Sequence, residues 1–177
     1  MQRQVITQAF LGLGFALAGL VCLPPPAEAT PAAEAASAAP SVPSEAVFAR
    51  EASLAGLFDV KSGELAVERA QQEDVRQLAR DLVDDQKLAN ARLRAFAPKY
   101  VRDELSGTYE TEFKRLQAAG KNDFDRLFLD VQSHRQSRNV KLFEGYAAHG
   151  GDAVLRGYAS ETLAAVKKHR SRVEALR

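Results

Sequence analysis

Four expected helices each carry a polar side chain near the middle of an otherwise apolar face. These side chains are Lys61, Gln86, Gln136 with Gln132 one turn before it, and His169. Polar groups that point inward from the helices of a bundle are the arrangement that builds carboxylate and histidine metal sites. A dimetal site needs anionic carboxylates and neutral imidazoles, whereas glutamine offers a weak carbonyl ligand and a lysine cation repels a metal ion. The residue types therefore predict a polar core cluster without a metal ion or other cofactor.

A second hypothesis keeps a metal, with His169, Asp85, Glu64 and His134 as its ligands. It would make the protein a metal-dependent oxidase of di-iron or manganese type, or a metal-storage protein with a degenerate site. His134 lies two residues before Gln136, about 200° round a helix from it, which favours a surface position. A lone core histidine such as His169 is more often a hydrogen-bonded residue than a metal ligand. Convergence of the four side chains within coordination distance would separate the two hypotheses.

The helices that would position these residues are indicated by apolar residues spaced three or four apart. The central pattern covers residues 75–97, a rod of about 35 Å at about 1.5 Å per residue. Similar patterns cover residues 45–70, about 123–148 and the region after Asp152, and a shorter one lies within 99–121. Four long helices and a helical crossover predict an all-α antiparallel four-helix bundle. The apolar stripe of the helix expected over residues 75–97 consists of Val75, Ala79, Leu82, Ala89, Leu93 and Phe96.

Three acidic or amide residues are expected to cap helices. Asp74 precedes the second helix, Asn122 the third and Asp152 the fourth, and such side chains accept hydrogen bonds from the free backbone N–H groups of a first turn. The short connection at residues 71–74 predicts that the first two helices are antiparallel neighbours.

The start of the chain has the pattern of a cleavable signal peptide at residues 1–29. A basic Arg3 is followed by an apolar run over residues 9–23 and by Ala27-Glu28-Ala29, an A-x-A cleavage site. Cys22 is the only cysteine. Cleavage after residue 29 would therefore leave a mature chain without a thiol for catalysis or metal binding.

Residues 30–44 are rich in Ala, Pro and Ser, which predicts a flexible linker. The bundle domain is then expected over residues 45–177. The signal predicts a periplasmic or secreted protein that contacts the membrane only if the signal stays uncleaved, since its apolar run is short for a span of about 20 residues.

Composition and motifs exclude several classes of function. The chain has 24 basic and 23 acidic residues, which is not the basic excess of a nucleic-acid-binding protein. Mixed charges also disfavour a third hypothesis, an amphipathic helix that lies on lipid. The sequence has no phosphate-binding loop, serine-hydrolase elbow or H-E-x-x-H motif, which argues against an enzyme. A binding or structural module remains, with an envelope protein or a small ligand as its partner; the oligomeric state is left open.

Three stretches resemble an exported bacterial family of unknown function, whose members are often labelled membrane or outer-membrane proteins. They are ELAVERA…VRQLARDLVDDQ (residues 64–86), FDRLFLDVQ (residues 124–132) and LRGYASETLAAVKKH (residues 155–169). The resemblance covers residues 46–176. That family is regarded as ferritin-like, so the resemblance implies a ferritin-like topology for the bundle.

The resemblance also implies where a metal centre would have been. The family carries histidines where this chain has Gln86 and Gln136, a histidine that matches His169, and an acidic residue at or near Lys61, with Asp59 nearby. Two of the three histidines are thus glutamine here. This departure implies a bundle that has lost its metal centre and keeps a polar network in its place.

Overall fold

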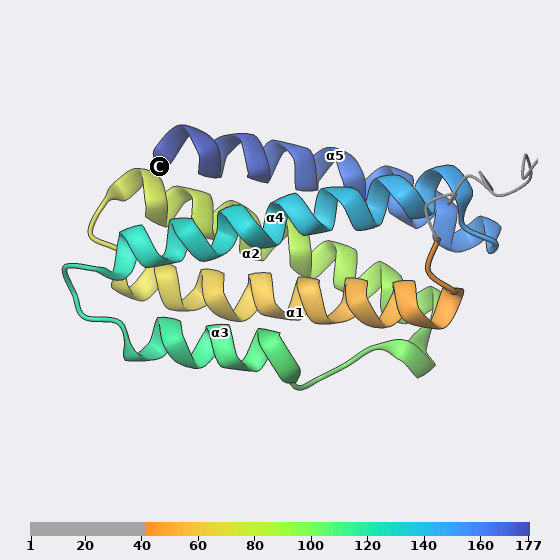
Figure 1. Cartoon of the computed structure of the whole chain (residues 1–177), viewed down its shortest axis with the longest axis horizontal. Helices are drawn as coiled ribbons and strands as arrows, with labels where there is room; N and C mark the ends of the chain where they lie inside the picture. Colours follow the sequence, from red (N-terminus) through yellow and green to blue (C-terminus); the bar gives the residue numbers. More distant parts are fainter. Residues whose placement is uncertain (1–41) are drawn as a thin grey trace, which may run out of the picture. The chain divides into compact units, whose positions relative to one another are not determined.

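The computed structural model describes residues 42–177 and shows an all-helical protein over that range, with no strand. The predicted signal peptide and nearly all of the predicted linker lie outside the described residues. The predicted all-α class is confirmed for the part that is described (Figure 1). Its helices are α1 (Glu45–Arg69), α2 (Glu73–Phe96), the short 3₁₀ helix η1 (Pro98–Tyr100), α3 (Gly107–Ala118), α4 (Phe124–His149) and α5 (Ala153–Leu176).

The four long helices pack in two closely joined pairs. α1 packs most extensively on α2, and α4 on α5, while α2 with α5 and α1 with α4 complete the arrangement. Only a few residues connect the helices of each pair, so these partners are antiparallel neighbours. The longer connection from α2 to α4 carries η1 and α3. The apolar pattern predicted one helix there, which is α3. α3 runs along the outer side of α1 (Figure 1). Within residues 42–177, no helix combines the length and the apolar character that crossing a bilayer requires.

Two apolar clusters fill the interior, one toward each end of the long helices. Buried polar residues of α2, α4 and α5 fall between the two clusters. On α2, for example, Gln86 follows Leu82 of the first cluster and precedes Leu93 of the second. In the second cluster, Phe48 stacks on Tyr146 with ring centroids 3.8 Å apart. Large members of the first cluster are Phe58, Leu78, Leu82, Leu116, Phe124 and Phe128, and of the second Phe48, Leu93, Phe143, Tyr146, Tyr158 and Val166.

The apolar stripe expected for the second helix is confirmed at five of its six positions, and Phe96 is the exception. Its side chain is 53% exposed. Phe96 is the last residue of α2, and the next residue, Ala97, leaves the helical conformation and is buried instead. The chain therefore turns before the stripe could continue into the core.

The expected caps differ from the observed ones at two of three helices. Asp152 does cap α5, since its carboxylate accepts a hydrogen bond from the Leu155 backbone N–H at 2.8 Å. Asp74 lies inside the first turn of α2 rather than at its N-cap, which is Gln72. The residue at the N-cap of α4 is Asp123 rather than Asn122, and its side chain makes no capping bond.

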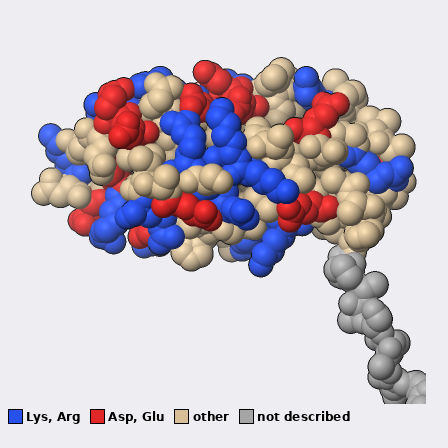
Figure 2. All heavy atoms as spheres, turned by 90° about the horizontal axis from the view of Figure 1, so that it is seen from above, with Lys and Arg blue, Asp and Glu red and all other residues tan. Residues whose placement is uncertain are grey.

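The surface carries both signs of charge. Figure 2 looks onto the α5 side, where Lys and Arg side chains gather near the middle with Asp and Glu side chains among and around them. Ion pairs join α5 to its neighbours, such as Lys167 to Glu144 of α4 at 2.7 Å and Glu161 to Arg92 of α2 at 2.9 Å. Exposed pairs of this kind contribute roughly 0–1 kcal/mol each, so they orient α5 without adding much stability.

Candidate functional site

A buried hydrogen-bond network joins α1 to α4 in the middle of the bundle. Gln136 Nε2 donates to Asp59 Oδ2 at 3.0 Å and to Gln132 Oε1 at 3.2 Å. Gln132 Nε2 donates in turn to Ser62 Oγ at 3.0 Å. All four side chains are fully buried, so these contacts replace the water that the polar groups lose on folding. Gln132 and Gln136 are therefore core residues, as the sequence predicted, and they are linked to each other.

The first helix contributes Asp59 to this network rather than Lys61. Asp59 is completely buried, whereas Lys61 is partly exposed. Residues two apart point about 200° apart on a helix, so only one of them can face the core. Asp59 lies four or seven residues from the buried Ala52, Ala55 and Ala66, so it shares their face of the helix. That spacing is the sequence signal that could have identified Asp59 as a core residue.

His169 of α5 faces Asp85 of α2. Its Nε2 lies 3.0 Å from Asp85 Oδ2, although the two atoms do not have hydrogen-bond geometry, and its Nδ1 has no partner. His169 is fully buried, while 39% of the Asp85 side chain is exposed. Burial lowers the pKa of His169, and the Asp85 carboxylate opposes that effect.

Gln86 is buried on α2, but its amide makes no hydrogen bond to another residue within the described range.

We expect Gln86→Leu to change the free energy of unfolding by less than about 1 kcal/mol, because a side chain of similar volume replaces an amide without protein partners. Gln136→Leu is the matched comparison and should lose about 1–3 kcal/mol, because it leaves Asp59 without its donor. Urea unfolding of both variants measures the difference; a large loss in Gln86→Leu would place that amide in the network.

Of the four alternative metal ligands, the structure brings together only His169 and Asp85. Glu64 is exposed and pairs with Lys87 at 2.9 Å. His134 is exposed too, with Nδ1 2.8 Å from the Asp130 backbone oxygen. Over residues 42–177, no three His, Cys, Asp or Glu side chains are grouped so that they could hold a metal ion.

The donor set of the α1–α4 network does not fit a dimetal centre. Asp59 is its only carboxylate, and Gln136 turns its amide N–H, not its carbonyl oxygen, toward that carboxylate. Burial raises the pKa of Asp59 to about 7, and metal ions bind the deprotonated form of such ligands. The network holds α1 and α4 together, and its oxygen lone pairs do not converge on a point where a metal ion could bind.

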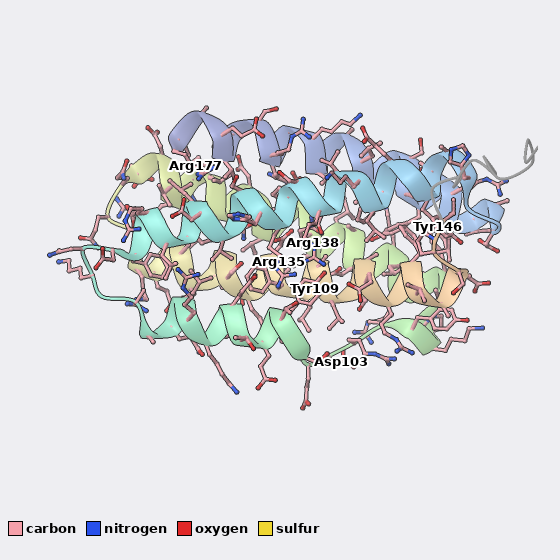
Figure 3. The ribbon with its side chains drawn as sticks, viewed as in Figure 1. Asp103, Tyr109, Arg135, Arg138, Tyr146 and Arg177 are labelled. Atoms are coloured by element: carbon pink, nitrogen blue, oxygen red, sulfur yellow. The ribbon has the colours of Figure 1, made fainter. Side chains whose placement is uncertain are left out.

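Arg135 is a buried charge that the sequence analysis did not single out. Its guanidinium lies 3.9 Å from the ring centroid of Tyr109, donates through Nη2 to Thr108 Oγ1 at 3.2 Å and forms an ion pair with Glu112. Three residues of α3 thus hold one arginine of α4, which Figure 3 shows beside α1. At the other end of α3, the Arg69 guanidinium donates to the backbone oxygens of Leu116 and Gln117. Apolar spacing could not reveal this docking, because it depends on charged side chains far apart in sequence.

A groove of about 430 Å³ lies between α1 and α4, next to the first turn of α3. Tyr109 forms one wall, and its hydroxyl donates to Glu51 Oε2 at 3.4 Å. Burial raises the pKa of Tyr109 to about 12, so the hydroxyl keeps its proton. Arg138 and Lys141 bring positive charge to the opposite side. The full lining is Val47, Glu51, Tyr109, Arg138, Asn139, Lys141 and Leu142.

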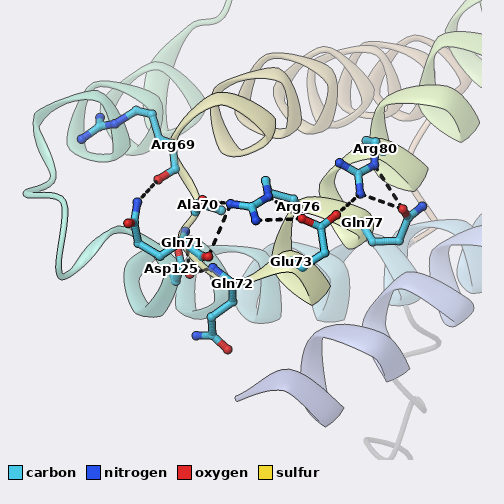
Figure 4. Close-up of polar contacts among 9 residues, drawn as sticks. All are labelled: Arg69, Ala70, Gln71, Gln72, Glu73, Arg76, Gln77, Arg80 and Asp125. Carbon is cyan, nitrogen blue, oxygen red and sulfur yellow. Dashed lines mark hydrogen bonds and ion pairs between the residues drawn. The ribbon is translucent and has the colours of Figure 1, made fainter.

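The turn that leads into α2 is held by a carboxylate from a distant helix. Asp125 of α4 accepts hydrogen bonds from the backbone N–H groups of Gln71 and Gln72 at 2.8–3.0 Å (Figure 4). These two residues immediately precede α2, so Asp125 fixes the connection between α1 and α2 and does not replace the cap expected from Asp74. Because the partners are more than 50 positions apart in sequence, local spacing could not identify this contact.

We expect Asp125→Ala to destabilise the bundle by about 1–3 kcal/mol, because two backbone N–H groups lose a largely buried acceptor. Asp123→Ala is the control: Asp123 lies two residues earlier, and its exposed carboxylate pairs with Arg126. The control should cost less than about 1 kcal/mol. Urea denaturation gives both values, and equal losses would contradict the role of Asp125 in holding the turn before α2.

Comparison with known proteins places the chain in a family. No curated protein and no solved structure matches it. A family model described as a domain of unknown function, DUF4142, matches residues 29–176. The match spans all five α-helices from Glu45 to Leu176. The chain therefore belongs to the DUF4142 family.

Proposed function

We propose that this protein is an exported, ferritin-like four-helix bundle that works as a metal-free binding or structural module of the cell envelope. The observation that carries the proposal is the pairing of Asp59 with Gln136 in the centre of the bundle. Where a ferritin-like centre would need free carboxylates and imidazoles, this chain places amides that are already bonded to their neighbours. The signal-peptide pattern supports export.

The connectivity of the helices supports a ferritin-like topology. Two antiparallel pairs, α1 with α2 and α4 with α5, are joined by a long connection that carries its own helix. Bundles with one long crossover have this connectivity.

The groove beside Tyr109 supports the binding part of the proposal. It combines apolar side chains such as Val47 and Leu142 with the buried amide of Asn139 and the positive charges of Arg138 and Lys141. A concave site of this size and mixed chemistry suits a small ligand or a loop of a partner protein.

The metal content of the mature protein tests the proposal. The full-length precursor is expressed, and the processed protein is purified from the periplasm, dialysed against metal-free buffer and subjected to elemental and mass analysis. We expect processing after Ala29, no stoichiometric iron, manganese or zinc, and a melting temperature that added metal does not change.

Stoichiometric metal that survives dialysis and is lost in His169→Ala would overturn the metal-free module in favour of an oxidase or metal-storage protein. His134→Ala is the matched control, because His134 is exposed and lies away from the core. Retention of the whole protein in the cytoplasm would overturn the envelope location.

A further inference from the structure

We propose that the interior of the bundle contains a proton-binding site, in which Asp59 is an uncharged carboxylic acid paired with the side-chain amide of Gln136 through two hydrogen bonds. In one of them, Gln136 Nε2 donates to Asp59 Oδ2 at 3.0 Å. In the other, the acid proton on Asp59 Oδ1 is donated to Gln136 Oε1. The two groups then form a closed ring of acid and amide.

The two remaining oxygens of this pair are the observation that points to a proton. Asp59 Oδ1 and Gln136 Oε1 are both fully buried, and neither has a hydrogen-bond partner. If Asp59 were ionised, both oxygens would be acceptors only, and neither could satisfy the other. A buried polar atom without a partner is unfavourable. One proton on the acid satisfies both atoms at once.

Gln132 fixes which edge of the Gln136 amide faces Asp59. Gln132 Oε1 accepts from Gln136 Nε2 at 3.2 Å, and Gln132 Nε2 is committed to Ser62. Rotating the Gln136 amide by half a turn would place its oxygen against the oxygen of Gln132. Gln136 therefore presents one N–H and one carbonyl to Asp59. That edge is complementary to a carboxylic acid, which has one acceptor and one donor, and not to a carboxylate.

The charged groups around Asp59 are committed elsewhere. Arg135 of α4 is the cation that acts on it, but Arg135 is paired with Glu112. Tyr109 of α3 interacts with Asp59 and keeps its own proton. The buried face of α2 carries Gln86 as its only polar residue. α5 contributes the buried His169, which faces the carboxylate of Asp85. Burial therefore dominates and raises the pKa of Asp59 to about 7.

The contact between α1 and α4 is consequently sensitive to pH near neutrality. Loss of the proton places a negative charge opposite the Gln136 carbonyl oxygen in the centre of the bundle. The charge then requires water or a new donor, and either one loosens the contact between the two helices. The site is independent of the proposed envelope role, because it depends only on residues of the bundle.

A carbon-13 NMR titration of the processed protein tests the site. The Cγ signal of Asp59, assigned through the backbone and checked by its loss in Asp59→Asn, is followed across the pH range. We expect a midpoint of about 7 instead of 3.8. The side-chain N–H signals of Gln136 should shift with the same midpoint. Asp84→Asn, a change at an exposed aspartate, should leave both curves unchanged.

A midpoint closer to 3.8 than to 7 would overturn the proposal, because Asp59 would then be ionised at neutral pH with a water molecule or cation as its partner. A midpoint of about 7 without any response of Gln136 would overturn the shared proton. The backbone assignment identifies both signals, so the test does not depend on whether Asp59→Asn folds. Metal content does not enter the readout, so this test and that of the proposed function fail separately.

Discussion

Replacing Arg135 with alanine is expected to lower the free energy of unfolding by roughly 3 kcal/mol, the low end of the range for breaking a buried ion pair. The low end applies because Glu112, which loses its partner, keeps 32% of its side chain exposed, whereas the arginine side chain is only 4% exposed. The substitution also removes the guanidinium from the ring of Tyr109, a contact that contributes about 0.5–2 kcal/mol. α3 should then detach more readily from α4.

Urea unfolding measures the loss, and limited proteolysis between α2 and α4 measures the release of α3. Arg138→Ala is the matched control, since Arg138 is an exposed arginine on the same helix; it should stay within about 0.5 kcal/mol of the parent. Arg135→Lys should recover little, because an ammonium cannot reproduce the planar fork and ring contact of the guanidinium. Equal effects of the two alanine substitutions would show that Arg135 does not hold α3.

The stability of the bundle is expected to contain a large contribution from Asp59 that falls as pH rises from about 4 to about 7. The pKa of Asp59 is raised from 3.8 to about 7 in the folded protein, so the folded state binds more protons than the unfolded state between these values. Its contribution is greatest below pH 3.8 and is lost as pH rises through about 7. The difference in pKa corresponds to roughly 4 kcal/mol.

Asp59→Asn should remove this dependence and stabilise the protein above pH 7, because an amide can make both bonds to Gln136 without a charge. The difference in unfolding free energy between parent and variant, measured by urea denaturation from pH 4 to 8, isolates Asp59. His169 acts in the opposite direction in both proteins: its lowered pKa removes stability as pH falls below 6.5. A difference that does not change with pH would contradict the prediction.

The helices and much of the core could be predicted from the sequence because their signals are local. Apolar spacing gave the long helices to within a few residues, and the cap of α5 is only three residues from its partner, Leu155. The contact of Asp125 with the turn before α2 could not be found in this way, since Asp125 belongs to another helix. Phe96 was misplaced because spacing does not show where a helix ends.

The candidate site was predicted only in part, for a physical reason. Gln132, Gln136 and His169 interrupt clean apolar stripes and were therefore visible. Charged residues are rarely fully buried. The pattern placed Lys61 inward on the first helix, and Asp59 and Arg135 were not assigned to the core. Their burial depends on partners supplied by other helices, which one helix considered alone does not reveal.

The arrangement of α1 and α4 has a consequence for the order of assembly. Each helical pair forms from segments adjacent in sequence, so its loop closes at little entropic cost. The polar contacts between α1 and α4 must instead close a loop of 70 residues between Ser62 and Gln132. Contacts of such long range slow folding. The two helical pairs are therefore expected to form early. The contact between α1 and α4, with Asp59 at its centre, should form last during folding and break first during unfolding.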